Sequence, residues 1–342
     1  DYKGAVEYLE DVLGRDAEAA GAHYPLAMAY RGLGDLTKAE RHLRQREDHV
    51  ILPADPLMVE LDELLESPQA YESRGIRALD QKQWTEAEAL FRKGLQLAPE
   101  SPALGHRLGT ALFMMDDARG AQEQFEAVVR KAPDYSPAQY SLGVLLQAQG
   151  RHLEAIERFS IALSSRSSYH EARLRLATSL RRAGRAKESV PHYQQILSVN
   201  PRLTEARFGH AMALVQIGRY ADARDRLIEG MKASSDQSVF SHGLARLLAA
   251  APDEGVRDGP RAISLVEELL RTEPRTLDLG ETLAMALAEL GRFDEAAKLQ
   301  RDLIRGAERG ALHDVARRLA RNLALYERGE ACRTPWPDEE VP

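Results

Sequence analysis

Histidine is the side chain best suited to metal binding or proton transfer near neutral pH, and ten histidines are scattered along this 342-residue chain. None of them belongs to an HExxH pair, and no dense carboxylate cluster accompanies them. The GxSxG turn that presents a nucleophilic serine is also missing. The sequence therefore predicts no catalytic residue, no metal site and no cofactor, and hence a protein that is not an enzyme.

Two further patterns bear on chemistry. The stretch GLGDLT, from Gly32 to Thr37, has the glycines of a phosphate-binding loop, but it follows no strand and lies between two predicted helices. Cys332 is the single cysteine, so the chain has no internal disulfide and no cysteine cluster for zinc, an iron–sulfur centre or haem. We therefore expect neither the stretch from Gly32 to Thr37 nor Cys332 to form a phosphate-binding or metal-binding site.

The net charge and the hydropathy of the chain limit the classes of partner that it is expected to bind. The net charge is −7, and the one basic stretch, residues 166–188, lacks the interleaved aromatics of single-strand nucleic-acid binders. No apolar run approaches the roughly 18 residues that span a bilayer. We therefore expect neither nucleic-acid binding nor direct membrane insertion.

The elements that would position any site repeat along the chain, mostly at a spacing of 34 residues. One small residue marks each repeat: Ala5, Ala39, Ala87, Ala121, Ala155, Ser189, Ala223, Ala262 and Ala296. Four residues later a larger side chain follows, such as Phe91, Phe125 or Phe159, with Gln300 as the exception. Twelve residues earlier lies a second small column, which includes Gly75, Gly109 and Gly143.

These columns resemble the tetratricopeptide repeat, a 34-residue unit with small and large residues at matching places. The resemblance implies an all-α fold: an α-α solenoid, a right-handed superhelix of tetratricopeptide helical hairpins with a C-terminal capping helix. A chain that is 44% apolar and only 6% aromatic agrees with a helical core of alanine and leucine.

The period divides the chain into units. We expect the second half of a truncated repeat in 1–19, a repeat in 20–53, an insertion with a short helix in 54–67, five consecutive repeats in 68–237, a repeat with a lengthened inter-helix turn in 238–276, a repeat in 277–310, a capping helix in 311–329 and an extended tail in 330–342. The insertion helix is predicted to start at Asp55, and the capping helix to bury a face from Leu312 to Tyr326.

The columns have physical roles. Small residues let the two helices of a hairpin approach closely, and we expect the phenylalanines to fill the space between one hairpin and the next. The hairpins are expected to turn near Gly34, Gly150, Gly184, Gly218 and Gly291.

Stacked hairpins leave a concave groove lined by the first helix of each repeat. Counting from the small column assigns these groove residues: Tyr24, Met28, Arg31, His106, Phe113, Tyr140, Thr178, Arg181, Phe208, Met212, His242, Arg246 and Met285. Aromatic, methionine and arginine side chains suit a peptide-binding surface. Arg181 and Arg246 are hypothesised to capture carboxylates of an acidic partner.

The predicted function is a non-catalytic protein–protein interaction scaffold that binds an extended or helical protein segment in this groove. The alternatives are an accessory domain of a larger bacterial enzyme or c-type cytochrome system, and a self-associating structural unit. The resemblance to bacterial proteins favours a periplasmic over a cytoplasmic location. Trp336 in the tail is expected to dock on its own chain or to enter the groove of a neighbouring molecule.

Overall fold

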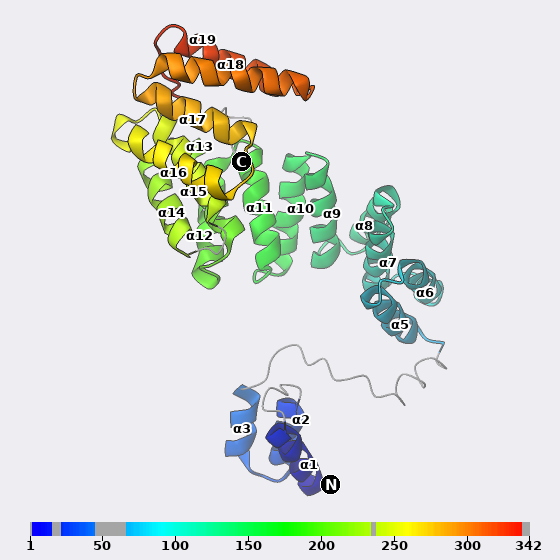
Figure 1. Ribbon diagram of the computed structural model, residues 1–342. Helices are drawn as coiled ribbons and strands as arrows, with labels where there is room; N and C mark the ends of the chain where they lie inside the picture. The colour runs from blue at the N-terminus through cyan, green and yellow to red at the C-terminus, as the bar shows by residue number, and fades with distance from the viewer. Residues whose placement is uncertain (1, 16–21, 45–65, 234–236, 337–342) are drawn as a thin grey trace. The chain divides into compact units, whose positions relative to one another are not determined.

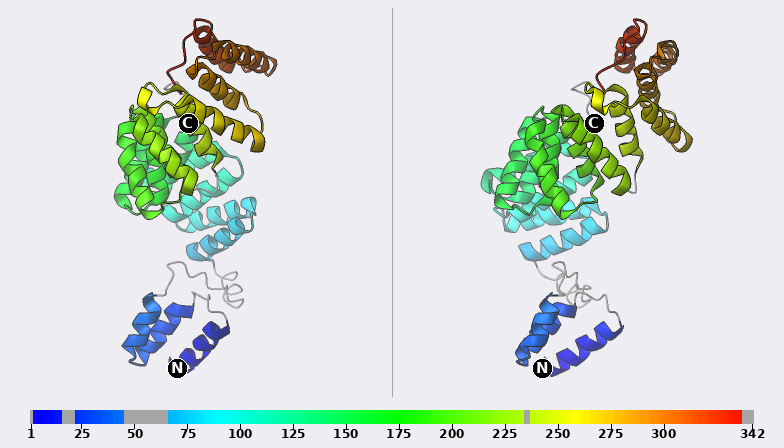
Figure 2. Two further views of the ribbon diagram at one scale, coloured as in Figure 1. Left: turned by 60° about the vertical axis from the view of Figure 1, so that its left-hand side comes forward. Right: turned by 90° about the vertical axis from the view of Figure 1, so that its left-hand side faces the viewer.

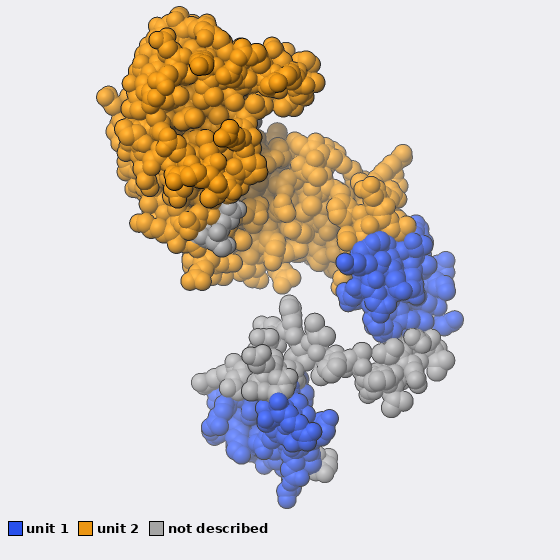
Figure 3. Space-filling view, viewed as in Figure 1, with its two compact units in different colours: residues 1–99 blue, residues 100–342 orange. Residues whose placement is uncertain are grey.

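The protein is described by a computed structural model that covers residues 2–15, 22–44, 66–233 and 237–336 (Figure 1). These residues form α-helices joined by turns, and no β-strand occurs among them. The chain divides into two units, residues 1–99 and residues 100–342 (Figure 3). The prediction of an all-α fold is confirmed.

Unit 1 contains five of the described helices. They are α1 (Tyr2–Arg15), α2 (His23–Gly32), α3 (Leu36–Arg44), α5 (Pro68–Asp80) and α6 (Trp84–Leu97). Helix α2 packs against both α1 and α3, and α5 packs against α6. Val6, Leu26 and Tyr30 are buried where the first three helices meet.

The insertion predicted at 54–67 lies almost entirely outside the described residues, including the helix expected from Asp55. Its last residue is Ser67, which caps α5 because its hydroxyl accepts a hydrogen bond from the Ala70 amide at 3.1 Å. Pro68 follows in the first turn, where its missing amide proton costs no hydrogen bond.

Unit 2 is a row of helical hairpins. Its helices are α7 (Pro102–Met114), α8 (Ala118–Lys131), α9 (Ser136–Ala148), α10 (His152–Ser165), α11 (His170–Arg182), α12 (Ala186–Val199), α13 (Thr204–Gln216), α14 (Tyr220–Ala233), α15 (Ser238–Ala250), α16 (Gly259–Thr272), α17 (Leu277–Glu289), α18 (Phe293–Arg309) and α19 (His313–Tyr326). Each helix packs on the next, so the hairpins stack in chain order (Figure 2). The first helices of successive hairpins also touch, as in α7 with α9 and α15 with α17.

Glycines of the second small column lie directly under the phenylalanine rings. A Cβ atom on Gly109 would come within 2.5 Å of Phe125, and one on Gly143 within 2.6 Å of Phe159. The close approach expected at this column is confirmed. Each ring lies on the glycine of its own hairpin, however, whereas we expected it between hairpins, because the ring fills the gap left where the two helices are closest.

Most turns that join the two helices of a hairpin contain a residue in the left-handed backbone conformation. The five turn glycines that the sequence singled out all have positive φ, from 72° at Gly291 to 83° at Gly34. Glycine adopts this conformation without the clash that a Cβ atom causes. At three other helix–helix turns the same conformation is taken by Lys82, Asp116 and Ala311.

The turn between α15 and α16 is longer than the others and contains the 3-10 helix η2 (Glu254–Val256). Val256 is buried and anchors this turn to the core. Asp258 then caps α16, because its carboxylate accepts from the Arg261 amide at 2.9 Å.

Helix α19 covers the last hairpin and packs on α18. Leu319 and Tyr326 are buried on its inner face, but Leu312, which was expected on that face, is exposed because it precedes the helix as its N-cap residue. Gln300, the exception in the large column, is buried, and its Nε2 donates to the Leu319 carbonyl at 2.9 Å. The polar residue thus joins α18 to α19.

Candidate functional site

Several predicted groove residues lie at the surface of their first helices. In unit 1, Tyr24 and Arg31 are exposed and Met28 is half-buried. In unit 2, Phe113 at the end of α7 is 45% exposed. The half-buried members in unit 2 are His106, Tyr140, Thr178, Phe208 and His242.

Hydrogen bonds connect successive first helices in unit 2. The His106 Nε2 on α7 lies 3.0 Å from the Ser141 hydroxyl on α9, and the His242 Nε2 on α15 lies 3.0 Å from the Thr282 hydroxyl on α17. Between them along the row, the Gln147 amide on α9 donates to the Ser179 hydroxyl on α11 at 2.8 Å. These polar groups hold the hairpins in register.

Burial changes the titration of the two histidines. Loss of solvent lowers the pKa of His106 to about 4, and the same effect lowers the pKa of His242. The Arg107 and Arg246 charges act in the same direction. Both imidazoles are therefore neutral at pH 7 and serve as hydrogen-bonding groups.

Four predicted groove residues are buried. Met212 and Met285 have almost no exposed surface and belong to the main core, because α13 and α17 are covered by neighbouring helices on the sides where these residues lie. Arg181 and Arg246 are each only 4% exposed. Met212, Met285 and Arg181 therefore do not lie on an open surface, and Arg246 reaches only the edge of a pocket.

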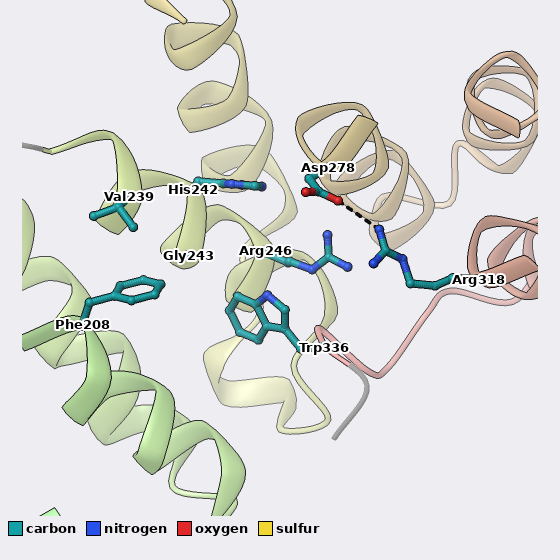
Figure 4. Close-up of a pocket in the computed structure, with 8 residues that line it drawn as sticks. All are labelled: Phe208, Val239, His242, Gly243, Arg246, Asp278, Arg318 and Trp336. Carbon is teal, nitrogen blue, oxygen red and sulfur yellow. Dashed lines mark hydrogen bonds and ion pairs between the residues drawn. The ribbon is translucent and has the colours of Figure 1, made fainter. Parts of the chain in front are cut away.

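A pocket of about 450 Å³ opens beside α15 (Figure 4). It brings together Phe208 from α13 with His242 and Arg246 from α15, all three of which the sequence assigned to the groove. The remaining lining residues are Val239, Gly243, Asp278, Arg318 and Trp336. A Cβ atom on Gly243 would lie 3.1 Å from the Phe208 ring, so the absent side chain lets this ring approach α15 closely.

A buried ion pair lies next to this pocket. The Arg246 Nη2 donates to the Glu281 carboxylate on α17 at 2.8 Å, and both side chains are almost fully buried. Two groups from α19 reach the same carboxylate: the Asn322 amide donates at 3.0 Å, and an Arg318 nitrogen lies at 3.2 Å. Glu281 therefore joins α15, α17 and α19.

The tail segment, which we define as residues 330–336, returns to α15. The Arg246 Nε donates to the Pro335 carbonyl, and the guanidinium lies 5.9 Å from the centre of the Trp336 ring. Cys332 is buried, and this burial raises the pKa of its thiol. Trp336 thus docks within its own chain, on α15.

No three histidine, cysteine, aspartate or glutamate side chains gather in a metal-binding arrangement within the described part of the chain. Among the helices described there, none has the length and apolar character needed to cross a bilayer.

Sequence reasoning missed Asp278, Arg318 and Trp336 as neighbours of α15. Asp278 lies on α17 and reaches the pocket because α17 packs on α15, whereas the positions of Arg318 and Trp336 depend on α19 and the tail, which no repeat period encodes. The one available signal was an aromatic residue between two prolines in the tail, since an isolated tryptophan in a polar segment usually finds an apolar surface.

Comparison with protein families gives one consistent result. Three models described as tetratricopeptide repeat match the chain, one at residues 78–144, one at residues 1–48 and 174–238, and one at residues 276–310. Together these matches span more than half of the chain.

Solved structures of the same kind are similar. The chain is 19% identical to pilF of Pseudomonas aeruginosa, with a TM-score of 0.52 over 64% of this chain and 96% of that one. It is also 17% identical to YrrB, a TPR protein described as having an unusual peptide-binding site, with a TM-score of 0.49 over 56% of this chain and 98% of that one. No curated protein sequence is significantly similar to the chain. The matched repeats and the stacked hairpins together show that this chain belongs to the tetratricopeptide repeat family.

Proposed function

We propose that the protein is a non-catalytic scaffold that binds a segment of a partner protein along the first helices of unit 2. The tetratricopeptide fold supports an interaction scaffold, because stacked hairpins expose a continuous row of first helices. The finer assignment is that the partner is anchored at the pocket beside α15.

The composition of this pocket carries the proposal. Phe208 on α13 and Val239 on α15 form apolar walls, and a volume of about 450 Å³ has room for a large side chain. Aromatic or aliphatic side chains that enter such pockets supply much of the binding energy of protein interfaces. Phe113 and Tyr140 on α7 and α9 would extend the contact along the row.

Charges in this region favour an apolar anchor over an acidic one. The Arg246 charge is already balanced by Glu281, and Arg318 also contacts Asp278 at 2.9 Å. Within the basic stretch, Arg185 pairs with Glu188 and the Arg173 guanidinium donates to the Ser167 carbonyl. These cations contribute mainly to the structure of the chain itself.

Site-specific photo-crosslinking tests this function. A photoreactive phenylalanine analogue is introduced at Phe113, Tyr140 or Phe208 on first helices, and at Leu153 as a matched position on second helix α10, where the side chain is 66% exposed. We expect crosslinks to one partner from the three first-helix positions and none from Leu153. Equal crosslinking from all four positions, or none from any, would contradict the proposed binding face.

A further inference from the structure

The tail segment contacts unit 2 at two places. Its first half is anchored: Cys332 is buried in the main core, and Arg333 forms an ion pair with Glu289 of α17. Its second half, residues 334–336, reaches α15. The second half can therefore leave α15 while the first half stays attached to unit 2.

The second half makes contacts of the kind that a bound peptide makes. The Pro335 carbonyl accepts a hydrogen bond from Arg246, and the Trp336 ring lies against the guanidinium and lines the pocket. A backbone carbonyl bound to a fixed donor and an aromatic ring at an apolar pocket are two common elements of peptide recognition.

Arg246 is well placed to donate a hydrogen bond to the backbone of such a segment. Glu281 and Thr282 lie within 2.8 and 3.5 Å of its two Nη atoms, so the guanidinium is held in one orientation with Nε directed to the tail. A donor that is already ordered loses little entropy when it binds a carbonyl. The recognition element belongs to α15 and is present whichever segment occupies it.

We propose that residues 334–336 are a built-in ligand, and that the partner segment is an extended peptide with the same chemistry: a proline followed by an aromatic residue, whose proline carbonyl accepts from Arg246. This inference rests on the proposed scaffold function and names the partner class of its pocket. Binding of the partner displaces the tail, so the tail lowers the apparent affinity of the site.

The size of the effect follows from competition. A ligand tethered by a short linker has an effective concentration of about 1 mM. If the free tail binds with a dissociation constant of about 0.1 mM, the tethered tail weakens a competing peptide about tenfold. Removing residues 334–336 restores the intrinsic affinity.

Peptide titration tests the inference. The probe is a fluorescein-labelled peptide of residues 331–336, kept under reducing conditions, and its anisotropy is followed with three chains: the full chain, a chain ending at Arg333, and a matched control chain ending at Trp336. We expect the chain ending at Arg333 to bind about tenfold more tightly than the other two. A peptide carrying Trp336→Ala is expected to bind none of them.

A second variant keeps the test informative if the shortened chain does not fold. If circular dichroism shows that the chain ending at Arg333 is not folded, the full chain with Trp336→Ala is used instead, and it too is expected to bind the probe more tightly than the parent. Equal affinity in the shortened and full chains would overturn the inference, as would equal binding of the two peptides. A dimer of the full chain that requires Trp336 would also overturn it, because the tail would then occupy another copy.

The two proposals fail separately. Crosslinks from Phe113 and Tyr140 do not involve the tail, so the scaffold function survives a negative peptide titration. A positive titration without crosslinks would leave the tail as a displaceable ligand and would reject the extended binding face.

Discussion

Glu281 shows how much can depend on one buried carboxylate. It accepts hydrogen bonds from Arg246 and Asn322 and lies in contact with Arg318, so helices from two hairpins and the capping helix converge on it. Removing one member of a buried ion pair leaves a charge without solvent or a partner.

We expect Glu281→Gln to lower the free energy of unfolding by about 3–5 kcal/mol. The exposed pair of Arg292 and Glu295, at 2.7 Å, provides the control, and Glu295→Gln should change stability far less because solvent screens an exposed ion pair. Urea unfolding followed by circular dichroism measures both. Similar losses for the two variants would show that the buried network adds nothing beyond a surface ion pair.

Ala311 illustrates a residue in an unfavourable backbone conformation. Its φ is 55°, and a left-handed conformation costs an alanine roughly 1–2 kcal/mol, whereas glycine adopts it freely but loses more entropy on folding. We expect Ala311→Gly to stabilise the chain by about 0.5–1 kcal/mol in thermal unfolding. The reverse change, Gly150→Ala, meets no atom within 4 Å and should destabilise through the backbone alone. A loss of stability in Ala311→Gly would refute this account.

At the scale of the element, a helical hairpin is held together where the phenylalanine ring of its second helix packs against a glycine of its first helix. Phe159 on α10 is fully buried against Gly143 on α9, and the same pair recurs as Phe125 with Gly109. Because each hairpin touches mainly its neighbours, damage to one pair is expected to remain local.

Phe159→Ala should lower stability by about 3–5 kcal/mol, since it removes a buried ring and leaves a cavity. Hydrogen exchange should show faster exchange in α9, α10 and α11 than in the parent, with little change in α17 and α18. Leu153→Ala on the same helix, where the side chain is 66% exposed, is the control and should change stability by about 0.5 kcal/mol or less. Uniformly faster exchange would instead mean that the unit unfolds as one body.

At the scale of the whole molecule, stability should depend on pH through buried neutral histidines. The pKa of His106 and that of His210 are both lowered to about 4, chiefly by burial, against an ordinary value of 6.5. Between these values the unfolded chain binds more protons than the folded chain. Stability is therefore complete above pH 6.5 and is lost as the pH falls toward 4.

We expect His106 alone to account for a loss of about 2 kcal/mol between pH 7 and pH 5. The variant His106→Gln keeps a hydrogen-bonding group near Ser141 but cannot titrate, so its stability should fall less over the same range. Urea unfolding of parent and variant at the two pH values gives this difference directly. If the two curves fall in parallel, His106 is not the titrating group.

The repeat period predicted most of the fold because each column has a local physical cause. Small residues at Gly109 and Gly143, and turn glycines such as Gly150, are required by close approach and by positive φ, and both requirements act within one hairpin. Helix class and hairpin turns could therefore be predicted from the sequence alone.

The site depended on contacts that no period contains. Counting along a helix placed Met212 and Arg246 beside Phe208 and His242, but only the packing of neighbouring helices decided that the first two are buried and the others partly exposed. The pocket, the Glu281 network and the docking of Trp336 arise where side chains of α19 reach α17 and the tail reaches α15. Sequence spacing reports what each helix presents to its own hairpin, whereas contacts between residues about 90 positions apart exist only once the chain has folded.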